Sequence, residues 1–150
     1  YRIELYHLKN LEKMPKQEIS ITTDAVIFST LSNTDYVLLI QRKNDPFKDE
    51  WALPGGFLET DETFETGAKR ELKEETGLDV KALKQIGVFG AIGRDPRGRT
   101  ISIAFVGTIS STPKVEAADD AKNAKWWPLN NLPNLAFDHS EIIAKALKAL

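Results

Sequence analysis

The sequence predicts an α/β domain, a layered fold in which helices cover a β-sheet. Apolar, β-branched segments recur along the chain, and two further segments carry apolar residues on one helical face, which together favour sheet-and-helix layers. A length of 150 residues, 41% of them hydrophobic, suits one domain with its own core. We therefore expect a single domain over residues 1–150. The start at Tyr1 rather than Met is compatible with a fragment of a longer protein.

Strand signals divide the chain into short, regularly spaced segments. Turn-forming residues at 32–35 separate the first two segments, which predicts a hairpin. The segment that starts at residue 100 alternates with a period of two, as in a half-buried strand, and Pro128 is expected to end the last one. The predicted strands are 19–30, 36–43, 82–92, 100–110 and 125–129.

A first helix is predicted from about Glu62 to Thr76. Thr60 or Asp61 is the expected N-cap, and Gly77 is the expected stop, because glycine readily adopts the left-handed conformation that ends helices. The apolar stripe at four-residue spacing comprises Phe64, Ala68 and Leu72.

A second helix is predicted to follow Asp138. Asp138 as N-cap and Glu141 three residues later fit a capping box, and the pair Phe137 and Ile142 fits a hydrophobic staple. This combination predicts both where the helix begins and how the chain enters it. His139 lies directly after the cap, so we expect it to have a structural role at the helix start rather than a catalytic one.

Composition excludes several classes of protein. The formal net charge is −2 with interspersed acids and bases, so no basic surface for nucleic acid is predicted in this chain. There are no cysteines, which excludes disulfides, thiolate metal sites and a thiol nucleophile. No segment resembles a signal peptide or a membrane span. We therefore expect a cytoplasmic protein without a membrane partner.

Three carboxylates crowd the first predicted helix. Glu71, Glu74 and Glu75 are three and four residues apart, so they project to neighbouring points of one surface and repel one another. A hard divalent cation such as Mg²⁺ or Mn²⁺ takes oxygen ligands and turns this repulsion into attraction. Arg70 precedes Glu74 by four residues and is placed to orient it. The alternative is an ordinary solvated helix face, in which lysines offset an acidic cluster.

The full spacing resembles the Nudix box, Gly-x5-Glu-x7-Arg-Glu-U-x-Glu-Glu-x-Gly-U with U aliphatic. Read from Gly56, every fixed position of that pattern is filled, ending at Leu78. The resemblance implies a Nudix-type α/β/α sandwich with a mixed sheet and hydrolysis of a nucleoside diphosphate derivative. It implies that Glu71, Glu74 and Glu75 bind the metal, with the Gly55 carbonyl as a further ligand and with Arg70 and Glu62 as supports. The general base would be Glu75 or an acid outside the box, for which the candidates are Glu116, Asp119 and Asp120.

Segments outside the box narrow the resemblance to the ADP-ribose pyrophosphatase branch and the related transcriptional regulators of NAD metabolism. The segments are FKDEWALPGGFLE, RDPRGRTISIAF, DDAKNAKWWPL and LAFDHSEII. This resemblance implies hydrolysis of ADP-ribose to AMP and ribose 5-phosphate with Mg²⁺ or Mn²⁺, and it leaves a homodimer open. Two alternatives stay open as well: a ligand-sensing domain of a regulator, and a hydrolase of a nucleoside triphosphate or nucleotide sugar.

A basic loop between two predicted strands is the first candidate for substrate binding. Arg94, Arg97 and Arg99 lie in the stretch GRDPRGRT, and guanidinium groups suit bidentate phosphate contacts. Phe47 and Trp51 are aromatic residues suited to stacking on an adenine. The alternatives are an exposed polar turn for the loop and core packing for the aromatic residues.

Overall fold

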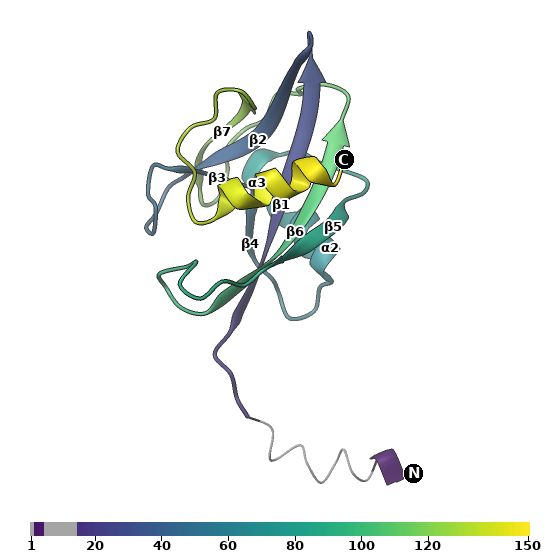
Figure 1. Cartoon of the computed structure of the whole chain (residues 1–150), viewed down its shortest axis with the longest axis vertical. Coiled ribbons are helices and arrows are strands. Elements are labelled where there is room, and N and C mark those ends of the chain that lie inside the picture. Colours follow the sequence, from purple (N-terminus) through teal and green to yellow (C-terminus); the bar gives the residue numbers. More distant parts are fainter. Residues whose placement is uncertain (1, 5–14) are drawn as a thin grey trace.

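The computed structural model describes residues 2–4 and 15–150, and these residues form a seven-stranded sheet with a helix on each face (Figure 1). The helices are α2 (Phe64–Thr76) and α3 (His139–Lys148). The strands are β1 (Ser20–Leu31), β2 (Thr34–Arg42), β3 (Trp51–Ala52), β4 (Gly55–Phe57), β5 (Lys84–Phe89), β6 (Thr100–Ile109) and β7 (Ala121–Pro128). Neither helix has the length and apolar character that crossing a bilayer takes, and the same holds for every described helical residue.

The sheet is mixed, as predicted. Its strands follow the order β3-β2-β1-β6-β5, with β4 paired to β1 and β7 paired to β2. β1 and β6 run parallel, in register from Ser20 opposite Thr100 to Ser29 opposite Ile109, and the other pairs are antiparallel. The long parallel pair therefore forms the centre of the sheet.

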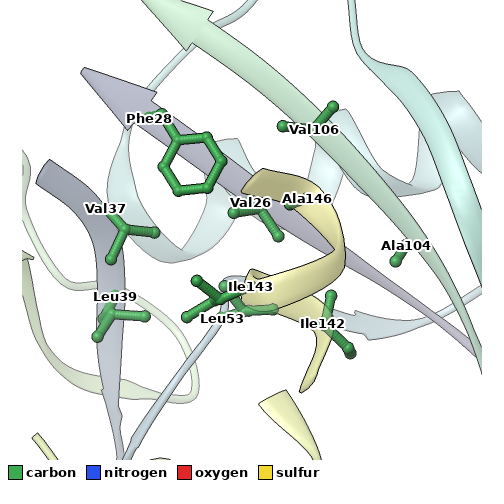
Figure 2. Close-up of a cluster of buried hydrophobic side chains, with 10 residues drawn as sticks. All are labelled: Val26, Phe28, Val37, Leu39, Leu53, Ala104, Val106, Ile142, Ile143 and Ala146. Atoms are coloured by element: carbon green, nitrogen blue, oxygen red, sulfur yellow. The ribbon is translucent and has the colours of Figure 1, made fainter. Parts of the chain in front are cut away.

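Strand β1 is buried on both faces, and this divides the core into two layers. Val26 and Phe28 point to the cluster beneath α3, which includes Ile142 (Figure 2). Ala25 and Ile27, on the opposite face, pack in the cluster beneath α2. Alternate residues of a strand face opposite sides of a sheet, so a helix on each side buries every position. The predicted α/β/α sandwich is confirmed.

The hairpin and the second strand pair lie where they were predicted. The β1–β2 turn places Ser32 and Asn33 at φ values of 50° and 64°, a left-handed conformation. β7 is longer than predicted, because it begins at Ala121 and pairs along β2. The strands β3 and β4 were not predicted, since two and three residues are too few for a pattern of alternation to show.

Helix α2 begins later than predicted. Its N-cap is Thr63, whose hydroxyl accepts a hydrogen bond from the Thr66 N–H at 3.2 Å, rather than Thr60 or Asp61. This shift leaves Phe64 at the first helical position and 42% exposed, so it does not belong to the buried stripe. Gly77 ends the helix with φ 76°, and its N–H donates to the Lys73 carbonyl, as predicted.

Helix α3 begins after Asp138, as predicted, but the predicted capping interactions are absent. The Asp138 side chain makes no capping bond, because both carboxylate oxygens accept from Arg94, at 2.6 and 2.9 Å. Phe137 and Ile142 pack in different clusters and so do not form the expected staple. The helix position is thus correct and the interactions assigned to its start are wrong.

His139 ties the start of α3 to the segment between β3 and β4. Its Nδ1 accepts the Leu53 N–H at 2.9 Å, and its Nε2 lies 3.6 Å from Asp24 Oδ1. The side chain is buried, and burial lowers its pKa below the ordinary 6.5 although Asp24 acts in the opposite direction. An unprotonated Nδ1 is required by the Leu53 bond, so the folded protein favours neutral imidazole.

We expect the two ends of the predicted apolar stripe to differ sharply in their contribution to stability. Leu72 is fully buried, so Leu72→Ala should lower the free energy of unfolding by about 2–5 kcal/mol. Phe64→Ala should cost less than about 1 kcal/mol, because much of the ring already meets water. Chemical denaturation of both variants checks this. Equal losses would contradict the placement of Phe64.

His139 should make stability fall in mild acid. Below pH 6.5 the unfolded chain binds a proton at this imidazole and the folded chain resists it, so the stabilising contribution is complete above that pH and is lost as pH drops. This residue changes the free energy of unfolding by at most about 1.4 kcal/mol per pH unit. His139→Asn retains an acceptor for Leu53 and should flatten the dependence of unfolding free energy between pH 7.5 and 5. An unchanged slope in that variant would refute the assignment.

Candidate functional site

Helix α2 packs directly against the Gly55–Gly56 pair. This pair lies in strand β4, which pairs with β1 so that Gly55 lies opposite Asp24. A Cβ atom on Gly55 would lie 2.2 Å from the Thr23 carbonyl oxygen, and one on Gly56 would lie 2.6 Å from the Glu71 carboxylate carbon. Both distances are below van der Waals contact. Glycine at both positions therefore lets β4 approach the acidic helix.

Glu75 is the most deeply buried acid of the helix. It is 6% exposed, and its Oε2 accepts the Gly55 N–H at 3.0 Å. Burial raises the pKa of Glu75 to about 8; the Gly55 hydrogen bond opposes this rise, and the nearby carboxylates of Glu71 and Asp24 add to it. The fold thus holds an acid where its charge is disfavoured, which is unusual outside functional sites.

Glu71 lies one turn earlier, with its carboxylate against Gly56. Burial is the largest influence on its pKa, which is raised; Arg70 opposes this and Glu74 reinforces it. The two raised pKa values have a common origin, since carboxylates are crowded together with little access to water. A cation at this position would relieve both.

Arg70 organises the acids around it. Its Nη1 donates to Glu71 Oε1 at 2.9 Å and to Glu74 Oε2 at 3.1 Å. Its Nε and Nη2 donate to the two oxygens of Glu62, at 2.9 and 2.6 Å, and Nη2 also reaches the Phe57 carbonyl. Glu62 lies before the helix, so this one side chain joins the α2 surface to the preceding loop and to β4.

The three predicted metal ligands are not equivalent. Glu71 and Glu75 line the adjacent pocket, whereas Glu74 does not, and the Glu74 side chain is 44% exposed and turned to Arg70. Across residues 2–4 and 15–150, no three His, Cys, Asp or Glu side chains already converge on one point. The pocket therefore receives two of the three carboxylates, with Gly55 beside them.

The pocket contains an acidic group and a basic group of side chains. Its volume is about 270 Å³. Phe137 and His139 also line it. The acidic group comprises Asp24, Asp45, Glu71, Glu75, Asp95 and Asp120, and the basic group comprises Arg42, Arg94 and Arg97. Both charges in one cavity suit a ligand that carries phosphate together with a metal ion.

The arginines of the predicted basic loop have different environments. The Arg94 side chain is 4% exposed and forms a two-point ion pair with Asp138. Arg97 forms a similar pair with the buried Asp95, at 3.0 and 2.7 Å. Arg99 is not among the residues that line the pocket, and its Nη1 donates to the Gly90 and Ala91 carbonyls.

The two aromatic residues predicted to stack on adenine do not line the pocket. The Phe47 ring packs against Phe137, with centroids 4.7 Å apart, and Trp51 packs edge-on against Trp127 at 5.0 Å. Phe57 and Phe137 line the pocket instead. The aromatic side chains of the cavity therefore come from the end of β4 and from the segment that leads into α3.

The acidic loop before β7 brings one of its three candidates to the pocket. Asp120 lines it, whereas Glu116 is exposed and pairs with Lys114 at 3.4 Å. Asp119 adopts a positive φ of 53° at the turn into β7 and does not line the pocket. The loop also closes the end of α2, because the Ala118 N–H donates to the Glu75 carbonyl.

The pocket-lining residues that sequence reasoning missed include Asp24, Arg42, Asp45, Phe57, Asp95 and Phe137. The Asp24 carboxylate accepts from the Ser102 hydroxyl and faces His139. Two of these residues could have been found, because a charged residue within or at the end of an apolar strand indicates a functional or paired charge. They are the acid within the apolar stretch ITTDAVIF and the arginine that ends the apolar run YVLLIQR. Nothing in the sequence distinguished Phe137 from a core residue.

Comparisons with known proteins agree with this geometry. A family profile described as the NUDIX domain matches residues 21–149. The ADP-ribose pyrophosphatase of Methanocaldococcus jannaschii is 44% identical over 140 residues, which cover 92% of this chain and 82% of that protein. The ADPR responsive transcriptional repressor NtrR of Acinetobacter baylyi is 36% identical over 134 residues, 87% of this chain; the match spans about half of the repressor (54%).

Two solved structures are similar over nearly the whole chain. The NUDIX domain of Shewanella oneidensis NrtR, in complex with ADP ribose, superposes with a TM-score of 0.84 at 32% identity, covering 97% of both chains. The second structure is a bifunctional NMN adenylyltransferase/ADP ribose pyrophosphatase from Francisella tularensis, complexed with AMP and a Mn ion. It superposes with a TM-score of 0.80 at 36% identity, covering 99% of this chain and 46% of that one. With the sandwich, the acidic helix and the glycine pair in place, this chain belongs to the NUDIX domain family.

Proposed function

We propose that this protein is a metal-dependent pyrophosphohydrolase that cleaves ADP-ribose to AMP and ribose 5-phosphate. The observation that carries the proposal is the pair of crowded carboxylates, Glu71 and Glu75, packed against Gly55 and Gly56 of β4 at the edge of a pocket that also holds arginines. The similarity to a protein named ADP-ribose pyrophosphatase, and to a domain crystallised with ADP ribose, supports the choice of substrate.

The residues present fit Mg²⁺ or Mn²⁺. The site offers hard oxygen donors, and burial raises the pKa values of Glu71 and Glu75, with neighbouring carboxylates adding to the rise and Arg70 opposing it at Glu71. Glu71, Glu74 and Glu75 would hold the ion, with the Gly55 carbonyl as a further ligand. When bound, a divalent ion lowers the pKa of a coordinated water and screens charge on phosphate oxygens. A Mn ion in the structure of the Francisella tularensis relative supports this choice.

The chain's own residues supply orientation and proton transfer. Arg70 fixes the carboxylates of Glu71 and Glu74 through two donors of its guanidinium group. Water attacks one phosphorus of the diphosphate, the phosphoanhydride bond breaks, and the leaving phosphate retains the bridging oxygen. A carboxylate must accept the proton of the attacking water, and Glu75 and Asp120 are the candidates because both line the pocket.

A ligand-sensing role is the second candidate. It is favoured by the 36% identity to a transcriptional repressor described as ADPR responsive. A sensor would bind ADP-ribose without turning it over. The acids that the family pattern requires are all in place in this chain, from Glu62 to Glu75, and they favour the enzyme.

Purified protein should hydrolyse ADP-ribose with a higher kcat/KM than NADH, nucleotide sugars or nucleoside triphosphates. AMP should be the nucleotide product, and chelation by EDTA should reduce the rate to background because no ion would then activate the water. Product chromatography across this panel, with Mg²⁺, Mn²⁺ or EDTA, checks the prediction. Equal rates for all substrates would refute the substrate assignment, and tight binding of ADP-ribose without product would favour the sensor.

Glu74→Gln should lower kcat by orders of magnitude and leave the fold intact. The change removes a proposed metal ligand, while the exposed ion pair that it breaks with Arg70 contributes little to stability. Steady-state kinetics and thermal unfolding test the two halves of this expectation. Glu141→Gln, an exposed acid on α3, is the matched control and should behave as wild type. Near-normal turnover in Glu74→Gln would remove Glu74 from the site.

A further inference from the structure

Arg42 differs from the other arginines of the pocket in having no acidic partner. Arg94 is paired with Asp138 and Arg97 with Asp95, both through two hydrogen bonds. Among the described residues, no aspartate or glutamate lies within ion-pair distance of the Arg42 guanidinium. A half-buried charge without a counter-ion is costly, and proteins generally retain one where a ligand supplies the opposite charge.

One nitrogen of the Arg42 side chain is fixed by a hydrogen bond, and the other two are available to donate to a ligand. It ends β2, its Nε donates to the Pro46 carbonyl at 2.6 Å, and its guanidinium carbon lies 5.0 Å from the centroid of the Phe137 ring. Within the part of the chain that the structure describes, Nη1 and Nη2 have no hydrogen-bond partner. The Pro46 contact therefore explains the position of Arg42 and leaves two N–H-bearing nitrogens for a ligand in the pocket.

Arg97 approaches the same ring from the β5–β6 loop. Its guanidinium carbon lies 5.8 Å from the Phe137 centroid, and Asp95 fixes its Nε and Nη2. The two cations repel each other: burial, and then the charge of Arg97, lowers the pKa of Arg42, while the more distant acids Glu75, Asp95 and Asp120 oppose this. Two fixed guanidinium groups at one aromatic ring form a site for an anion with several oxygens, and phosphate matches their geometry.

We propose that Arg42, with Arg97 beside it, binds the non-bridging oxygens of the substrate's diphosphate. The identity of that substrate rests on the proposed function, whereas the phosphate chemistry rests on the geometry around Phe137. The sequence assigned phosphate binding to Arg94, Arg97 and Arg99, and we add Arg42 and retain Arg97. In the structure the Arg94 side chain is 4% exposed and paired with Asp138, the Arg97 side chain is 41% exposed although Asp95 holds it, and Arg99 lies outside the pocket lining.

Three variants test this proposal. Arg42→Gln removes the charge, Arg42→Lys keeps it without the guanidinium fork, and Lys43→Gln removes an exposed charge one residue away as the matched control. Calorimetric titration with ADP-ribose and with inorganic pyrophosphate, in EDTA so that no turnover occurs, measures binding. We expect Arg42→Gln to weaken both ligands about tenfold to a hundredfold, the range for a lost hydrogen bond to a charged group. Arg42→Lys should recover part of the loss, and Lys43→Gln should bind as wild type.

Other results would overturn the proposal. Binding of both ligands by Arg42→Gln within about twofold of wild type would show that Arg42 makes no phosphate contact. Equal losses in Arg42→Lys and Arg42→Gln, accompanied by a lower unfolding temperature in both, would indicate that the Pro46 contact alone matters. If wild type binds pyrophosphate through Arg42 but not ADP-ribose, the proposed substrate fails and the phosphate site stands. If wild type binds neither, both fail.

Discussion

The close approach of the Gly55–Gly56 pair of β4 to helix α2 is the constraint on which the site depends. Side chains larger than hydrogen at these positions would collide with β1 or with the Glu71 carboxylate, so the strand can pack on the helix only with glycine at both positions. This contact buries Glu75, lends it the Gly55 N–H, and raises the pKa values of Glu71 and Glu75 through burial and mutual repulsion. The sandwich provides the support, since β1 fixes the glycine pair by pairing with β4 on one side and packs against α2 through Ala25 and Ile27.

The charges of the pocket are arranged so that most are satisfied within the protein and a few are not. Arg70 neutralises part of the acidic surface, and Asp95 and Asp138 hold Arg97 and Arg94. What remains is a pair of crowded carboxyl groups, Glu71 and Glu75, whose pKa values are raised, and a guanidinium group at Arg42 that has no ion-pair partner among the described residues. A divalent ion and a diphosphate would complement both, and this complementarity explains why a fold would tolerate buried charges that cost stability.

The sequence was most informative where spacing carries the information. The period of β6, the stop at Gly77 and the box from Gly56 to Leu78 gave the layers and the acidic helix, because these depend on local pattern. The predicted start of α2 and the predicted capping of α3 were wrong, since the Thr63 hydroxyl accepts the Thr66 N–H and the Asp138 carboxylate binds Arg94 instead of capping the helix. The lining of the pocket was the least predictable part. It depends on tertiary contacts between distant segments, as in the meeting of Arg42, Arg97 and Phe137.

The central claim is that crowded acids on α2 exist to hold a divalent ion beside a phosphoanhydride. Titration with Mn²⁺ followed by electron paramagnetic resonance tests it most directly, because the free ion and the bound ion give different signals. We expect wild type to bind Mn²⁺, to bind it more tightly when ADP-ribose is present, and to lose this binding in Glu71→Gln. Binding that is unchanged in Glu71→Gln, or absent from wild type even with ADP-ribose, would contradict the account.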